Sequence, residues 1–168
     1  MTDYSPTALL RFMALFLAQV FICNQIHWFG AISPMILLLF LYWTPLEREL
    51  MRSMLEAFAL GLVTDIASDT VALNTIALTV SAYLRPSILR LSYGSSVSFH
   101  TDSQFSGTLG QNLVYLFYLV LIHHLLFFSI EVFDLSRPFV ILTKTAIHLP
   151  FSFLIVAVIA ILFSSQKR

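Results

Sequence analysis

The stretch that decides the fold is Phe58-Ala-Leu-Gly61-Leu-Val-Thr-Asp65-Ile-Ala-Ser-Asp69-Thr-Val-Ala-Leu-Asn74-Thr75. It places two carboxylates and an amide between two long apolar runs. A charged side chain near the centre of a bilayer costs about 2.5–3.5 kcal/mol on insertion scales. Asp65 and Asp69 are therefore expected to lie near a membrane boundary, or to face protein or water rather than lipid.

The composition is typical of a membrane protein. The chain has 168 residues, of which 58% are hydrophobic and 11% are charged, and its net charge is +0. Soluble domains are about 45–50% apolar and about 25% charged. The balanced charge gives no electrostatic footprint for nucleic acid, so we expect no nucleic-acid partner. The single cysteine, Cys23, excludes an intramolecular disulfide.

Hydropathy predicts one compact membrane domain over residues 1–168. A helical span needs about 20 residues, and shorter runs can be accommodated by tilt or bilayer thinning. A long polar loop is predicted from Ser92 to Asn112. The six predicted spans cover residues 9–28, 35–43, 51–66, 71–84, 113–130 and 139–163.

The distribution of basic residues predicts the orientation. Cytoplasmic loops carry an excess of Lys and Arg. Two basic residues, Arg137 and Lys144, fall on one side of the predicted topology. The other side is predicted to be cytoplasmic, with both chain termini, and carries Arg11, Arg48, Arg52, Arg85, Arg90, Lys167 and Arg168.

Several polar residues fall within or beside the spans. Asp65 and Asp69 would share a helix face if the helix extends that far, which would suit a polar interaction site or a cation pathway. Alternatively, both carboxylates cap or solvate the turn between the spans. Glu56 has the spacing for an ion pair with Arg52, and an arginine on another helix, Arg11 or Arg85, is the alternative partner.

Small residues four apart allow two helices to approach closely. Ala57 and Gly61 have this spacing in the third span, and Ala14 and Ala18 have it in the first. No nucleophile elbow, phosphate-binding loop or zinc-ligand spacing is found. We therefore expect no catalytic residue, no cofactor and no metal.

The segment from Phe58 to Pro86 resembles MreD, the family of bacterial rod shape-determining membrane proteins. Upstream, Arg11, Gln19, Gly30-Ala-Ile-Ser-Pro34 and Pro45 are similar to features of that family, and Tyr83-Leu-Arg85 is similar downstream. Ala72 stands where many members have glycine, and we expect a conventional backbone there. The central motif is matched by Phe58, Gly61, Leu62, Asp65, Ser68, Leu73, Asn74 and Thr75.

This resemblance implies an all-α fold, a six-transmembrane-helix bundle similar to the substrate-binding subunits of energy-coupling-factor vitamin transporters. It implies a non-catalytic scaffold in the bacterial inner membrane that binds a single-span protein of the MreC type and, through it, MreB-like cytoskeletal and peptidoglycan-synthesis proteins. A second copy of the chain is a further candidate partner. We expect Asp65, Asn74 and Arg85 to fix the helix arrangement.

A different function remains open at this point. The chain could be the vitamin-binding subunit of a transporter. Ala14 and Ala18 would then contact a coupling subunit. The ligand would lie on the outward side, near Asp65, Asp69, Lys144 and His148.

Overall fold

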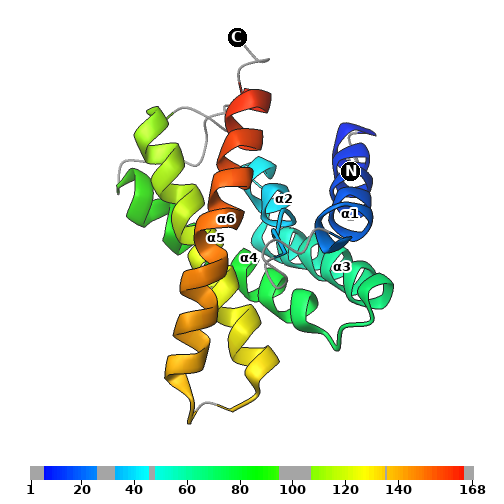
Figure 1. The fold of residues 1–168 in the computed structure, drawn as a ribbon. Helices are drawn as coiled ribbons and strands as arrows, with labels where there is room; N and C mark the ends of the chain where they lie inside the picture. Colours follow the sequence, from blue (N-terminus) through cyan, green and yellow to red (C-terminus); the bar gives the residue numbers. More distant parts are fainter. Residues whose placement is uncertain (1–5, 26–32, 46–47, 95–106, 135, 165–168) are drawn as a thin grey trace.

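A computed structural model describes residues 6–25, 33–45, 48–94, 107–134 and 136–164. Within these ranges the chain is helical and contains no strand (Figure 1). The beginning of α1 and the end of α6 both lie in the upper half of Figure 1, and the turn between α5 and α6 lies at the bottom. The elements are α1 (Pro6–Phe21), the 3₁₀ turn η1 (Cys23–Gln25), α2 (Leu38–Trp43), α3 (Leu50–Ser68), α4 (Leu73–Tyr93), α5 (Leu109–Val132) and α6 (Pro138–Ser164).

Among the residues that the structure describes, two helices are long and apolar enough to cross a membrane. They are Leu109–Val132 and Pro138–Phe163, and they contain the predicted spans 113–130 and 139–163. Residues Leu10–Gln25 form a shorter apolar helix. The helix α3 covers the third predicted span, and α4 covers the fourth from Leu73 onward. Both helices carry charged residues along their length, such as Glu56 and Arg85.

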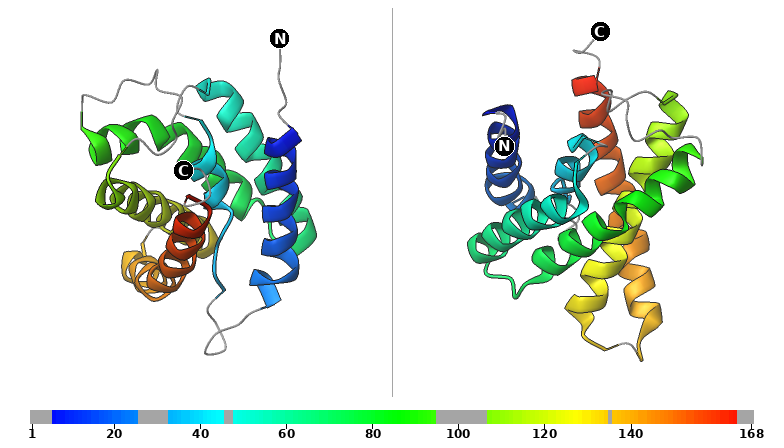
Figure 2. Two further views of the ribbon diagram at one scale, coloured as in Figure 1. Left: turned by 90° about the horizontal axis from the view of Figure 1, so that it is seen from above. Right: turned by 180° about the vertical axis from the view of Figure 1, so that it is seen from behind.

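Only part of the second predicted span, 35–43, is helical, because α2 contains 6 residues. Residues 33–36 are not helical, and residue 37 is in a turn. The segment passes through the middle of the molecule, between α1 and the α5–α6 pair (Figure 2). Its side chains form the centre of the core, and Leu37, Leu38, Leu39 and Leu41 are completely buried.

The length of this segment explains how it traverses the core. Four residues of extended backbone, 33–36, cover about 13 Å, and the six residues of α2 add about 9 Å. Together these parts cover about 22 Å. Non-helical backbone is tolerated inside a protein where the surroundings supply hydrogen bonds.

The predicted span 71–84 and the predicted loop 92–112 both need correction at their ends. The α4 helix continues through Pro86 to Tyr93, because Ile88 and Leu89 are buried in the core and hold the additional turns. The α5 helix begins at Leu109, inside the predicted loop. Thr108 starts it with a capping box, since its Oγ1 accepts from the Gln111 N–H (3.3 Å) and Gln111 Oε1 accepts from the Thr108 N–H (2.9 Å). Residues 95–106 of the predicted loop and the turn at Gly30 lie outside the described residues.

Candidate functional site

The α3–α4 turn is organised around one buried carboxylate, Asp65. Its Oδ1 accepts hydrogen bonds from Thr70 Oγ1 (2.5 Å), the Asn74 backbone N–H (3.0 Å) and Asn74 Nδ2 (2.9 Å). Its Oδ2 accepts from the Thr75 backbone N–H (2.8 Å) and Thr75 Oγ1 (2.6 Å). We call Asp65, Thr70, Asn74 and Thr75 the Asp65 cluster.

This geometry explains why the carboxylate lies inside the protein. The first N–H groups of a helix have no partner within that helix. Ala72, the N-cap residue of α4, supplies no side-chain cap. The Asp65 side chain of the neighbouring helix takes the place of this missing cap. It accepts hydrogen bonds from the backbone N–H groups of the second and third residues of α4. A negative charge at a helix N-terminus is also favoured by the helix dipole.

Asp69 behaves differently from Asp65, so the predicted shared helix face is not formed. The α3 helix ends at Ser68, and Asp69 takes the left-handed conformation at φ 53° while its N–H bonds to the Asp65 carbonyl. Asp69 is exposed, whereas Asp65 is buried. Of the two alternatives, capping of the turn agrees with the structure.

Ala72 also departs from expectation, because its φ is 57°. The expected conventional backbone is therefore wrong. Only glycine occupies this left-handed region without steric cost, and a residue with a Cβ loses about 1–2 kcal/mol there. The glycine found here in many MreD-like sequences fits the observed backbone better than the alanine of this chain.

Gly61 is the point of closest approach between α3 and α4. A Cβ at this position would meet Thr75 Cα at 2.5 Å, Thr75 N at 2.7 Å and Asn74 C at 2.9 Å. Ala57, one turn earlier, is completely buried. The absence of a side chain at Gly61 therefore brings α4 close enough for its first N–H groups to reach Asp65. The other predicted small pair differs, since Ala14 is exposed and Ala18 is half-buried.

A second cluster surrounds the buried amide of Gln19 and serves the extended part of the central segment. Gln19 Oε1 accepts from the Ile36 N–H (2.8 Å), and Gln19 Nε2 donates to the Pro34 carbonyl (3.1 Å) and to Asn24 Oδ1 (2.8 Å). Asn24 Nδ2 in turn donates to Ser68 Oγ (2.7 Å) at the end of α3. This Gln19 cluster links α1, the central segment and α3.

The next backbone group of the central segment is bound from the other side of the molecule. The Met35 N–H donates to Ser152 Oγ (3.2 Å) on α6, and the same oxygen contacts His124 Nε2 (3.0 Å) on α5. His124 Nδ1 contacts the Val120 carbonyl (2.8 Å). These bonds satisfy backbone groups that would otherwise be buried without a partner.

The third cluster, the Arg85 cluster, consists of Arg85, Thr44, Pro45 and Tyr115. Arg85 is buried on α4, and its Nε donates to Tyr115 Oη (2.9 Å) on α5. Its Nη1 donates to the Pro45 carbonyl (3.2 Å) and its Nη2 to the Thr44 carbonyl. Thr44 is the C-cap of α2. The guanidinium thus covers a helix C-terminus, where a positive charge is favoured.

Glu56 forms ion pairs near the beginning of α3. Its Oε1 lies 3.1 Å from Arg52 Nε and 3.1 Å from Arg48 Nη1. The predicted Arg52 pair is confirmed, and Arg48 is an additional partner. The structure shows no ion pair between Glu56 and either Arg11 or Arg85 among the described residues.

Three of the four residues of the alternative outward ligand site, Lys144, His148 and Asp65, are engaged with neighbours. Lys144 Nζ lies 2.8 Å from Glu131 Oε2, and His148 Nδ1 contacts the Lys144 carbonyl at 2.8 Å. Both oxygens of Asp65 are occupied by α4 and the turn. Within the described ranges, no group of three or more His, Cys, Asp or Glu side chains is placed to hold a metal ion.

The three clusters contain five of the ten residues of the predicted site. Asp65, Asn74, Arg85 and Pro34 are buried, and exposed Pro45 contributes its carbonyl to Arg85. Tyr115 and Ser152 were not predicted, because their sequence neighbourhoods give no sign of their distant partners, the Arg85 side chain and the Met35 N–H. Comparisons of the chain with models of protein families, with curated proteins and with solved structures find no match.

Proposed function

We propose that this chain is a non-catalytic membrane scaffold of the MreD type, which binds a single-span partner of the MreC type in the bacterial inner membrane. Through that partner it would couple an MreB-like cytoskeleton to peptidoglycan synthesis. Both termini are proposed to be cytoplasmic, as the distribution of Lys and Arg indicates.

One observation carries the proposal. Several polar residues and one proline that give the resemblance to MreD lie in buried contacts between elements: Gln19 and Pro34 in one cluster, and Asp65, Asn74 and Thr75 in another. Their polar atoms bond one another or backbone groups. This supports a motif that specifies a helix arrangement, because a catalytic motif needs polar groups directed at a substrate.

The same contacts disfavour the vitamin-binding alternative. A ligand near Asp65 would have to compete with five hydrogen bonds that the carboxylate already accepts. Small-molecule sites instead present a few convergent polar groups to an open cavity.

Replacement of the native protein in a rod-shaped bacterium tests the proposal. Cells carrying Asp65→Ala or Asn74→Ala should lose rod shape or fail to recruit the MreC-type partner, although both variants should still insert into the membrane. Asp69→Ala is the matched control and should leave cell shape unchanged. Rod-shaped cells with both the Asp65 and Asn74 changes would contradict the proposed role.

A further inference from the structure

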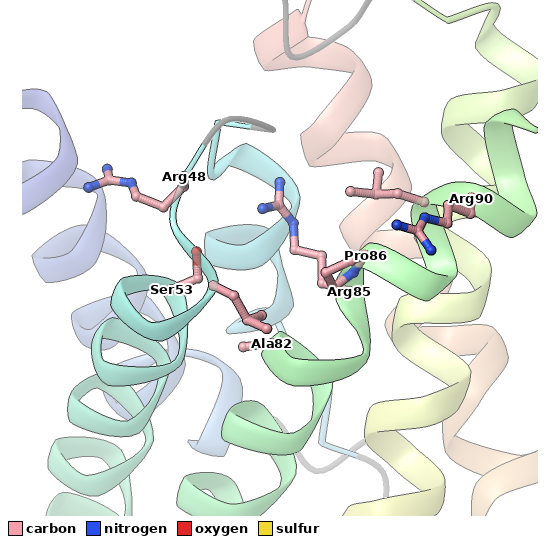
Figure 3. Close-up of a pocket in the computed structure, with 8 residues that line it drawn as sticks. Arg48, Ser53, Ala82, Arg85, Pro86 and Arg90 are labelled. Carbon is pink, nitrogen blue, oxygen red and sulfur yellow. The ribbon is translucent and has the colours of Figure 1, made fainter. Parts of the chain in front are cut away.

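We propose that a pocket between the start of α3 and the second half of α4 binds a phosphate group, of the kind carried by phospholipid headgroups. The pocket has a volume of about 190 Å³. A cavity needs only about 10–15 Å³ on this scale to hold one water, so there is room for a larger group. Its lining includes Arg48, Ser53, Ala82, Arg85, Pro86 and Arg90 (Figure 3).

The charge of the lining favours an anion. Three arginines line the pocket, and none of the residues that line it is acidic. The nearby carboxylate of Glu56 is shared by two arginines, Arg48 and Arg52. Arg85 donates to two carbonyls and a tyrosine hydroxyl, which are uncharged acceptors. Two carboxylates, Glu49 and Glu56, stand against the four arginines Arg48, Arg52, Arg85 and Arg90 in this region, so the described residues around the pocket carry an excess of positive charge. Arginine is well suited to binding phosphate.

A buried hydroxyl gives independent evidence for a ligand. Ser53 lines the pocket and is only 2% exposed, and among the described residues its Oγ has no hydrogen-bond partner. Figure 3 shows this oxygen on the side of Ser53 that faces Arg48 and Arg85. A buried hydroxyl without a partner lowers the stability of the protein. A phosphate oxygen in the pocket would accept its hydrogen bond.

The position in the fold favours a phospholipid as the source of the phosphate. Ser53 lies in the first turn of α3, and anions are favoured at a helix N-terminus. Exposed apolar side chains adjoin the lining, since Met51 follows Leu50 and Leu91 follows Arg90. An acyl chain could lie against them. Basic pockets on the cytoplasmic side of membrane helices bind anionic headgroups, and Arg48, Arg85 and Arg90 belong to the side predicted to be cytoplasmic.

Native mass spectrometry of the detergent-purified full chain tests the inference, with phosphatidylglycerol and phosphatidylethanolamine as probes. The intact protein should bind phosphatidylglycerol at least tenfold more tightly than phosphatidylethanolamine. The double variant Arg48→Gln/Arg90→Gln should lose about tenfold or more of that affinity. Arg137→Gln is the matched control, because Arg137 is an exposed arginine paired with Asp134 in the α5–α6 turn. The affinity of this variant for phosphatidylglycerol should equal that of the unchanged protein.

Ser53→Ala keeps the test decisive if the double variant fails to fold. Removing an unpartnered hydroxyl should leave the lipid-free protein as stable as before, or more stable. The same change should reduce phosphatidylglycerol affinity several-fold. If Ser53→Ala only impaired folding, the stability of the lipid-free protein would fall together with the lipid affinity.

Competition with inorganic phosphate identifies the source of the ligand. If millimolar phosphate fails to displace phosphatidylglycerol, the pocket binds a lipid headgroup. If phosphate binds alone, and does so less well in Ser53→Ala, the ligand is a free phosphate compound. Two results would overturn the inference. One is equal affinity for the two lipids together with no effect of phosphate. The other is that Arg48→Gln/Arg90→Gln and Ser53→Ala bind phosphatidylglycerol as tightly as Arg137→Gln does. The scaffold proposal would be unaffected, because none of its residues is changed.

Discussion

Asp65→Asn is the most informative single change, because it keeps the shape of the side chain and removes its charge. The carboxylate accepts five hydrogen bonds, two of them from the backbone of α4. In asparagine, one oxygen becomes an NH₂ group, which cannot accept and will face donors. Hydrogen bonds to a charged group contribute about 1.5–3 kcal/mol each, but bonds within one cluster do not add fully.

We therefore expect Asp65→Asn to lower the free energy of unfolding by about 3–5 kcal/mol, because the oxygen that becomes NH₂ loses at least two of these bonds. Each kcal/mol shifts Tm by about 2–4 °C in a chain of this length, so Tm should fall by about 6–20 °C. The assay heats the detergent-solubilised protein and measures the remaining monodisperse fraction by size-exclusion chromatography.

Asp69→Asn provides the matched control for this measurement. It makes the same chemical change four residues later, at an exposed residue with φ 53°. Asparagine tolerates the left-handed region well, so Tm should move by less than about 2 °C. If the two variants have the same Tm, Asp65 is not the residue that caps α4, and the reasoning is refuted.

Three further predictions follow from the α3–α4 contact and the topology. Gly61→Ala should lower the free energy of unfolding by about 1–3 kcal/mol, because the added Cβ overpacks against Thr75. Gly110→Ala is the control and should not lower it, since the added Cβ would meet only Thr108 Oγ1 at 3.9 Å. Equal Tm values for the two variants would contradict this prediction. Ala72→Gly should raise Tm by about 2–8 °C, since it relieves about 1–2 kcal/mol of backbone strain, and a lower Tm in the same heating assay would be the contrary result. Reporter fusions at Ser103 and Arg168 should both indicate the cytoplasm, and an external signal from either would reverse the predicted orientation.

Local patterns in the sequence predict much of this fold. Long apolar runs place α5 and α6 within a few residues of their ends. The spacing of Arg52 and Glu56 predicts their ion pair, since both lie on one helix face. The spacing of Thr108 and Gln111 is typical of a capping box, but the polar composition around them suggested a loop. These features depend on neighbours in sequence, and sequence patterns describe such neighbours well.

The remaining features depend on contacts between distant residues. The central segment is extended at residues 33–36 because two distant side chains bind its backbone. Gln19 is 17 residues away from its partner Ile36, and Ser152 is 117 residues away from its partner Met35. The left-handed backbone of Ala72 follows from the closeness of α3 and α4, which no local propensity of alanine indicates. Helix α4 continues through Pro86 since buried Ile88 and Leu89 outweigh the lost hydrogen bond.

The most direct test of the scaffold proposal is purification of the native protein from its own membranes, followed by mass spectrometry of everything that remains bound. We predict that a single-span membrane protein with a coiled-coil segment co-purifies in a fixed ratio, and that Asp65→Asn reduces its recovery whereas Asp69→Asn does not. A tightly held small metabolite with no such protein partner would contradict the proposal and favour a ligand-binding transporter subunit.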